Sequence, residues 1–137
     1  MTFGCGECHV RQGGDFHAAY TAQFGGTDCA AHGGGFLPSY AGRSDQGCLV
    51  FPGRCTGQLK KKPTEYLRQM YYDSIIFTPE ALRHLAAETG PGQIVMGTDY
   101  PYPWTSTSVD HILNAPGFSD AERAAMLGET AAKLLKI

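Results

Sequence analysis

The sequence predicts an α/β fold in which parallel strands alternate with helices. Two short apolar segments, 70–77 and 94–96, have the length and the β-branched and aromatic content of buried strands. Between them, residues 78–90 show a helical pattern of about the length that a parallel crossover needs. With 137 residues, the chain has room for one domain with a hydrophobic core.

Composition limits the classes of protein to consider. Hydrophobic residues make up 42% and charged residues 18%, which is typical of a soluble globular protein. A net charge of -2 gives no electrostatic reason to expect nucleic acid or an anionic membrane as a partner. Neither a secretory signal nor a run long enough to span a membrane is visible. We therefore expect a cytoplasmic protein without nucleic-acid or membrane partners, whose five cysteines are reduced.

Residues 1–28 are expected to be an irregular, glycine-rich lead-in that is not native to the fold, because they show no sustained period. Cys5, Cys8 and His9 form the Cys-x-x-Cys-His pattern of covalent haem attachment, and together with His17 they also offer zinc ligands. A non-enzymatic haem- or zinc-binding module is therefore one interpretation of this segment. The other is a loose segment without function.

Residues 29–137 are predicted to form the folded domain. It begins with a short apolar run, 29–31, followed by His32 and three glycines. A phosphate-binding loop would need a following Lys-Ser/Thr pair, which is absent. The glycines are expected either to permit a close backbone approach or a positive φ, or to clear space around His32. His32 itself is either a functional residue or a surface histidine.

Helices are predicted next. Residues 37–47 form the first, with Pro38 in its first turn, and a turn-rich segment follows over 48–58. A short helix is predicted for 63–69. In the strand 70–77, Asp73 and Ser74 interrupt the apolar pattern and either face an active-site mouth or end the strand.

The crossover helix has clear end signals. Thr78 is its expected N-cap and Gly90 its C-terminal residue. Its apolar face is predicted to contain Ala81, Leu82, Leu85 and Ala86. A later helix, 109–114, is expected to turn Val109, Ile112 and Leu113 inward.

The last segments complete the pattern. Ser119 and Glu122 form a capping box, and the terminal helix is expected to break or kink near Gly128. His84 and His111 are expected on helices away from the strand ends and are interpreted as ordinary surface or packing residues.

Asp99 is the main candidate functional residue. It follows the strand 94–96 after Gly97 and Thr98, and Pro101 and Pro103 then prevent the strand from continuing. In parallel α/β folds, ligand-binding and catalytic groups collect at this edge. Alternatively, Asp99 only caps the following turn. The aromatic residues at 100, 102 and 104 either line a substrate pocket or pack around the prolines.

Several motifs occur in an order that carries a family resemblance. They are His32-Gly33-Gly34-Gly35, Gly42-Arg43, Tyr72-Asp73-Ser74, the segment from Gly97 to Pro103, and Leu127-Gly128. Together they resemble the C-terminal half of the aminocarboxymuconate-semialdehyde decarboxylase family, within the amidohydrolase superfamily, over about residues 29–137. The resemblance implies a partial (β/α)₈ TIM barrel of the metal-dependent hydrolase type, with parallel strands and flanking helices.

The resemblance also implies roles for three residues. Asp99 matches the family's last-strand metal ligand, and the metal is a divalent cation, Zn²⁺ or in some relatives Mn²⁺. His32 matches the catalytic acid/base beside the metal-bound water, so His32 and Asp99 are both catalytic candidates. Arg43 matches the residue that binds a substrate carboxylate and reaches in from a neighbouring subunit, which implies a homodimer.

The implied activity is the metal-dependent non-oxidative decarboxylation of a small unsaturated or aromatic carboxylic acid. A metal-dependent hydrolase of the same superfamily is the alternative, because a metal-bound hydroxide also attacks esters, lactones and amides.

The chain also departs from the family pattern. A complete barrel needs roughly 250 residues. None of the five histidines forms a His-x-His pair, and only Asp99 matches a metal ligand. Catalytic zinc normally has three protein ligands. We therefore expect a truncated chain that binds metal weakly or not at all and is inactive, or nearly so, when alone.

Overall fold

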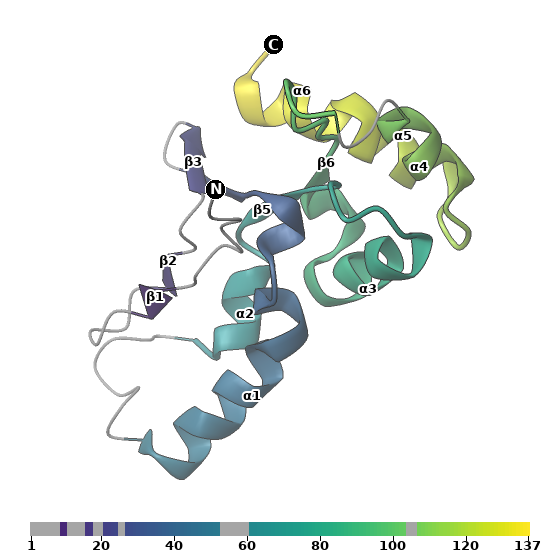
Figure 1. Cartoon of the computed structure of the whole chain (residues 1–137). Helices are drawn as coiled ribbons and strands as arrows, with labels where there is room; N and C mark the ends of the chain where they lie inside the picture. Colours follow the sequence, from purple (N-terminus) through teal and green to yellow (C-terminus); the bar gives the residue numbers. More distant parts are fainter. Residues whose placement is uncertain (1–8, 11–15, 18–20, 25–26, 53–60, 104–106) are drawn as a thin grey trace.

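The computed structural model describes residues 9–10, 16–17, 21–24, 27–52, 61–103 and 107–137 (Figure 1). Cys5, Cys8 and Trp104 lie outside the described residues, and for His9 and His17 only the backbone is described. The proposed haem or zinc motif and one residue of the aromatic segment therefore stay predictions.

A four-stranded sheet organises the fold. Its order is β3 (Thr21–Phe24), β4 (Thr27–Ala30), β5 (Tyr71–Asp73) and β6 (Ile94–Val95). β4, β5 and β6 are parallel neighbours, whereas β3 pairs with β4 in the antiparallel direction. The parallel strands with their crossover helices confirm the predicted α/β class.

The first 28 residues are not wholly irregular, which corrects that expectation. A separate antiparallel pair joins β1 (His9–Val10) to β2 (Phe16–His17), and β3 adds a strand to the main sheet. These strands were not predicted because each has only two to four residues, too few for a period to be recognised.

Helices flank the parallel strands in the order that a barrel segment requires (Figure 1). They are α1 (Leu37–Val50), α2 (Pro63–Leu67), α3 (Pro79–Thr89), α4 (Ser108–Asn114), α5 (Asp120–Ala124) and α6 (Thr130–Leu135). Short turns of other types are the 3-10 turns η1 (His32–Gly34) and η3 (Pro91–Gln93) and the π-helical turn η4 (Ala125–Glu129). None of the helices in the described part of the chain is both long and apolar enough to cross a membrane.

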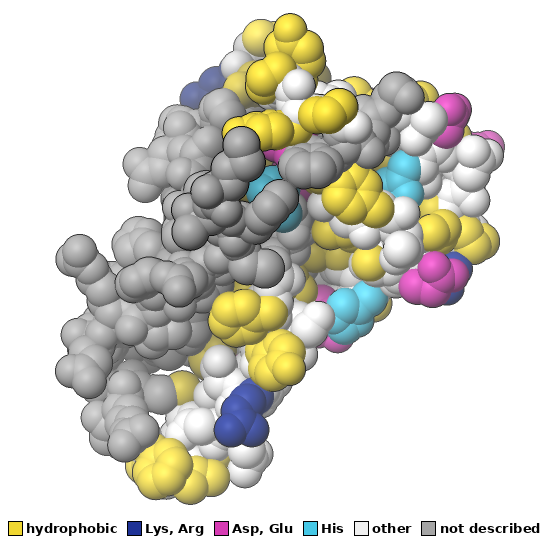
Figure 2. Space-filling view, viewed as in Figure 1, with side chains coloured by type: hydrophobic (Ala, Val, Ile, Leu, Met, Phe, Trp, Pro, Cys, Tyr) yellow, Lys and Arg dark blue, Asp and Glu magenta, His cyan; other side chains and the backbone are white. Residues whose placement is uncertain are grey.

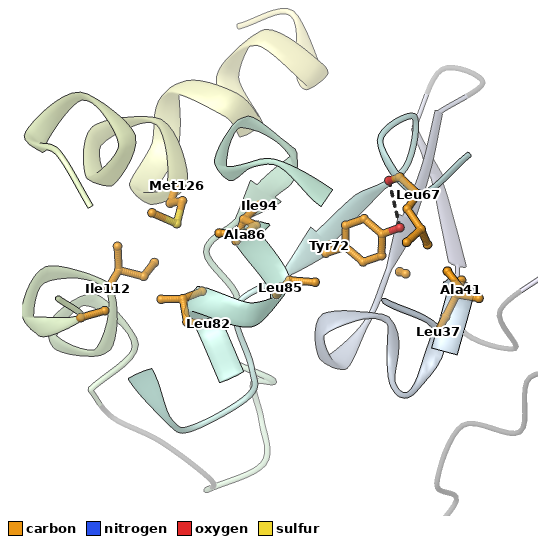
Figure 3. Close-up of a cluster of buried hydrophobic side chains, with 12 residues drawn as sticks. Leu37, Ala41, Leu67, Tyr72, Leu82, Leu85, Ala86, Ile94, Ile112 and Met126 are labelled. Atoms are coloured by element: carbon orange, nitrogen blue, oxygen red, sulfur yellow. Dashed lines mark hydrogen bonds between the residues drawn. The ribbon is translucent and has the colours of Figure 1, made fainter. Parts of the chain in front are cut away.

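The hydrophobic core lies between the sheet and these helices. Strand register places Ala30 opposite Tyr72 and Tyr72 opposite Ile94, so the three side chains share one face, and all are fully buried. Leu82 and Leu85 of α3 belong to the same buried cluster, and in Figure 3 Leu85 lies toward Tyr72 and Leu82 toward Ile112. The Tyr72 hydroxyl donates to the Leu67 carbonyl at 3.0 Å, and burial raises the pKa of Tyr72.

The predicted helix ends are confirmed. The Thr78 hydroxyl accepts the Ala81 amide at 3.2 Å, and Gly90 ends α3 with a φ of 97°. The Ser119–Glu122 capping box is also present, because each side chain accepts the other residue's backbone amide. These hydrogen bonds lower the pKa of Glu122. The predicted break near Gly128 is the π-helical turn η4.

Some ends of helices and strands, and two side chains expected to be buried, were predicted wrongly. α1 continues to Val50, three residues beyond the predicted end. β5 ends at Asp73, because after that residue the Asp73 carboxylate, and not a neighbouring strand, accepts the Ile75 amide. Val109 and Leu113 are 45% and 47% exposed, since the short helix α4 buries only its Ile112 side.

The expectation that every cysteine is reduced is wrong for Cys48, which is disulfide-bonded. No local pattern around one cysteine indicates whether it is paired. Cys29 is a free thiol.

Candidate active site at the carboxyl ends of the strands

The turn after β4 carries His32 in an unusual backbone conformation. His32 has a φ of 54°, and Gly33 and Gly34 follow with φ of 60° and 77°. Both glycines are buried: a Cβ on Gly34 would lie 2.8 Å from the Tyr72 ring, and one on Gly33 would lie 2.5 Å from Ile76 Cγ2. The close approach predicted for these glycines is therefore confirmed, and it is an approach to the sheet. Clearing space around His32 is not what Gly33 and Gly34 do.

Asp99 and His32 face each other across the strand ends. His32 Nε2 lies 3.7 Å from Asp99 Oδ1, and the two side chains are 50% and 23% exposed. Asp99 also has a left-handed backbone, with a φ of 57°. The structure thus brings together the two residues that the sequence singled out. His32 follows β4 and Asp99 follows β6, which are the two outer strands of the three parallel ones.

Asp73 is a third polar residue at this edge, and the sequence left its role open. Its Oδ2 accepts the His32 amide at 2.8 Å, and its Oδ1 accepts the amides of Gly33 and Ile75 at 3.0 Å each. Asp73 is the last residue of β5 and Asp99 follows β6, so its position at a strand end was the available signal. What the sequence did not indicate was the partner, because the His32 turn lies about forty residues away.

Cys29 lies beside Asp73 on the same face of the sheet. The register pairs Cys29 with Tyr71, so both point away from the Tyr72 side, and Asp73 follows by the alternation of the strand. Burial, and then the negative charge of Asp73, raise the pKa of the Cys29 thiol to about 11. The thiol is therefore protonated at neutral pH.

Arg43 lies apart from this pair. It is an exposed residue on α1, and no described contact joins it to His32 or Asp99. Tyr100 and Tyr102 are 89% and 60% exposed, so neither ring is buried against the neighbouring prolines.

A cavity of about 370 Å³ lies between the strand ends and α4. Ser74 and Gly97, which follow β5 and β6, line it together with Ser108 and His111. Burial lowers the pKa of His111, and within the described residues neither His111 Nε2 nor Ser108 Oγ has a hydrogen-bond partner. His111 therefore lies beside the strand ends, which corrects the expectation that its helix is away from them.

His84 is the ordinary surface histidine that was expected. It is exposed on α3, and its Nε2 lies 2.9 Å from Ser39 Oγ.

The described donor set does not fit a resident metal ion. Among the described residues, no group of three or more His, Cys, Asp or Glu side chains is placed to hold one. The Asp73 oxygens already accept three backbone amides, and the facing pair of His32 and Asp99 offers two ligands. Catalytic zinc normally takes three protein ligands.

Comparison with known proteins places the chain in a family. The amidohydrolase family is matched over residues 29–137. The 2-amino-3-carboxymuconate-6-semialdehyde decarboxylase of Caenorhabditis elegans is 36% identical over 110 residues, which are 80% of this chain and 27% of that protein.

Solved structures show the same fold. The 5-carboxyvanillate decarboxylase of Sphingomonas paucimobilis superposes with a TM-score of 0.68 at 28% identity, over 80% of this chain and 33% of that one. A dihydroxybenzoic acid decarboxylase of a Polaromonas species, solved with bound manganese and the inhibitor 2-nitroresorcinol, has a TM-score of 0.68 at 24% identity, over 79% of this chain and 33% of that one, and shows the fold alone. The chain thus spans about a quarter to a third of these proteins. Its parallel strands and flanking helices are part of a TIM-barrel fold, and the chain belongs to the amidohydrolase family.

Proposed function

We propose that this chain carries the proton-transfer residues of a non-oxidative decarboxylase that acts on a small unsaturated or aromatic carboxylic acid. The observation that carries the proposal is the approach of His32 Nε2 to within 3.7 Å of Asp99 Oδ1 at the ends of parallel strands. The decarboxylase names of the relatives support carbon dioxide release over the hydrolytic alternative.

The proposed chemistry is a proton exchange for carbon dioxide. The His32 imidazolium donates a proton to the carbon that bears the carboxylate, and the π electrons of the substrate form the new C–H bond. The bond from that carbon to the carboxylate then breaks, its electron pair restores the π system, and carbon dioxide leaves. The Asp99 carboxylate lies 3.7 Å from His32 Nε2 and is proposed to orient the ring for the transfer.

We propose that a divalent metal, manganese or zinc, takes part in catalysis only when other residues supply further ligands. The manganese in the Polaromonas relative supports the metal class. Because the described residues supply too few ligands, we propose that this chain alone binds metal weakly and releases little carbon dioxide.

Arg43 is proposed to bind a substrate carboxylate in a second copy of the chain, within a cytoplasmic homodimer. Its exposure on α1 supports this role, because an exposed guanidinium is available to a neighbouring molecule. Replacing Arg43 with Ala should then raise the substrate KM without changing the fold.

Complementation tests the proposal directly. The chain is co-expressed with the Caenorhabditis elegans relative from which the matching segment has been removed, and carbon dioxide release is measured with Mn²⁺ or Zn²⁺. Substrates are 5-carboxyvanillate, a dihydroxybenzoate and 2-amino-3-carboxymuconate semialdehyde. We expect activity from the pair, almost none from the chain alone, and none from the pair that contains His32→Ala or Asp99→Asn.

Arg83→Met is the matched control, because Arg83 is exposed on α3 and, among the described residues, its one ion pair is with Glu80 at 3.5 Å. This variant should keep the activity of the pair. Full activity of the His32→Ala pair would overturn the assignment of the proton donor. Ester or lactone hydrolysis without carbon dioxide release would favour the hydrolase instead.

A further inference from the structure

The turn that presents His32 needs a restraint. A left-handed backbone costs a residue with a Cβ about 1–2 kcal/mol relative to its usual conformations. His32 nevertheless has a φ of 54°, and its side chain is half exposed, so packing of the imidazole does not hold it there. Such conformations persist when surrounding contacts over-determine them.

Asp73 supplies the long-range contacts that meet this need. One carboxylate accepts two consecutive amides of the turn, those of His32 and Gly33, and also the amide of Ile75 in its own segment. Hydrogen bonds to a carboxylate are stronger than those to a neutral acceptor. The side chain therefore ties the turn after β4 to the end of β5.

The position of the imidazole follows from this tie. The Asp73 contacts are to the backbone of His32, whereas the contact of the ring is to Asp99, which follows β6. Asp73 thus acts from the middle strand of the parallel set on a pair that comes from the two strands beside it.

We propose that Asp73 is a positioning residue, whose carboxylate holds the His32 backbone so that the imidazole faces the Asp99 carboxylate. The importance of this position for catalysis rests on the proposed function. The coupling of Asp73 to the His32–Asp99 pair, however, can be measured on the chain itself. In this proposal Asp73 acts through the His32 backbone and takes no part in the proton transfer itself.

Nuclear magnetic resonance of the chain tests the coupling between Asp73 and the His32–Asp99 pair. In the unsubstituted chain, Asp99→Asn should shift the His32 ring resonances, because the carboxylate lies next to the ring. In a chain that carries Asp73→Asn, the same replacement should shift them much less. The His32 amide donates to Oδ2 and the Gly33 amide to Oδ1, so an asparagine, whose NH₂ group only donates, leaves one of these two amides without its acceptor in this geometry. Their exchange with solvent should accelerate at least about tenfold, as expected for loss of roughly 1.4 kcal/mol of local protection.

Asp45→Asn is the matched control. The Asp45 carboxylate also accepts two donors at the start of an element, the Thr64 amide at 3.0 Å and the Thr64 hydroxyl at 2.7 Å, but it does so at α2. It should lower stability without changing the response of His32 to Asp99→Asn. An equal response of His32 in the Asp73→Asn and unsubstituted backgrounds would overturn the proposal.

Two further measurements separate the proposed role of Asp73 from a folding defect and from failure of the proposed function. If Asp73→Asn does not fold, exchange of the His32 and Gly33 amides in the unsubstituted chain still decides, because rapid exchange of both contradicts the tie. In the complemented enzyme, Asp73→Asn should lower kcat by about 100-fold with little change in KM, as a misplaced catalytic group does. An inactive complement with intact coupling would count against the proposed function and leave the role of Asp73 standing.

Discussion

His32 and Asp99 share a backbone conformation that side chains with a Cβ seldom adopt. Their φ values are 54° and 57°, and they are two of the four such non-glycine residues in the described chain. Strained conformations of this kind collect at functional sites, where the surroundings enforce them. The glycine run predicted a positive φ at 33–35, but local propensity could not predict one at His32, because the cause is the contact with Asp73.

Cys29 offers a test of the electrostatics beside the site. Its thiol pKa is raised to about 11, first by burial and then by the charge of Asp73, whereas an unperturbed thiol has a pKa near 8.5. Because only the thiolate is nucleophilic, alkylation of Cys29 by iodoacetamide should keep accelerating above pH 9. The rate is followed at the Cys29 peptide by mass spectrometry. A plateau below pH 9 would contradict the raised pKa, and Asp73→Asn should move the rate profile to lower pH.

At the level of elements, signals that are local in sequence were the dependable ones. The Thr78 cap, the Ser119–Glu122 box and the Gly90 end involve residues within a few positions of each other, and all three were predicted. The length of β5 and the inward residues of α4 were not, because they depend on which surfaces other elements cover.

The π-helical turn η4 shows the same limit. A break near Gly128 was predicted, but its partner was not: the Met126 carbonyl accepts the Met96 amide at 2.9 Å, just beyond the end of β6. This bond joins the C-terminal helices to the last strand of the sheet. It links residues thirty positions apart, so no local pattern could indicate it.

Arg123 should be important for the connection between α4 and α5. Its guanidinium donates to the Leu113 carbonyl at 3.1 Å, to the Ala115 carbonyl at 2.9 Å and to the Phe118 carbonyl. Arg123→Met should lower the free energy of unfolding by about 1–3 kcal/mol, because partly buried carbonyls lose a charged donor. Urea denaturation measures the change.

Arg83→Met is the control for this experiment, since the Arg83–Glu80 pair is exposed and an exposed ion pair contributes about 0–1 kcal/mol. Equal losses for the two variants would show that the Arg123 contacts add nothing beyond a surface charge.

On the scale of the whole molecule, the order of motifs along the chain predicted more than any single element did. Placing His32 and Asp99 at one edge followed from the parallel-strand interpretation, and the two side chains do meet there. Their catalytic and metal-binding roles stay predictions, as does that of Arg43. The antiparallel strand β3 was not predicted, since its pairing with β4 depends on what is available to cover that edge of the sheet.

Self-association is the expected behaviour of the whole chain. Leu49, Val50 and Phe51, at the end of α1, are 70%, 56% and 54% exposed, and Figure 2 shows hydrophobic side chains gathered over that end of the molecule. Consecutive exposed apolar residues favour association, whereas isolated ones are common on monomers. The mass measured by light scattering at high micromolar concentration should therefore exceed the 14.7 kDa of one chain. Replacing Leu49 and Val50 with Glu should return it toward that value.

Leu113→Glu is the comparison that gives the result its meaning. Leu113 is 47% exposed on α4, and its replacement adds the same kind of charge away from α1. If association runs through the α1 end, this variant should still associate. If Leu113→Glu separates the copies as well as the α1 substitutions do, added charge and not the α1 surface is responsible. If the unsubstituted chain is monomeric, the exposed apolar residues at the end of α1 do not drive association. The homodimer proposed for Arg43 would then need another surface.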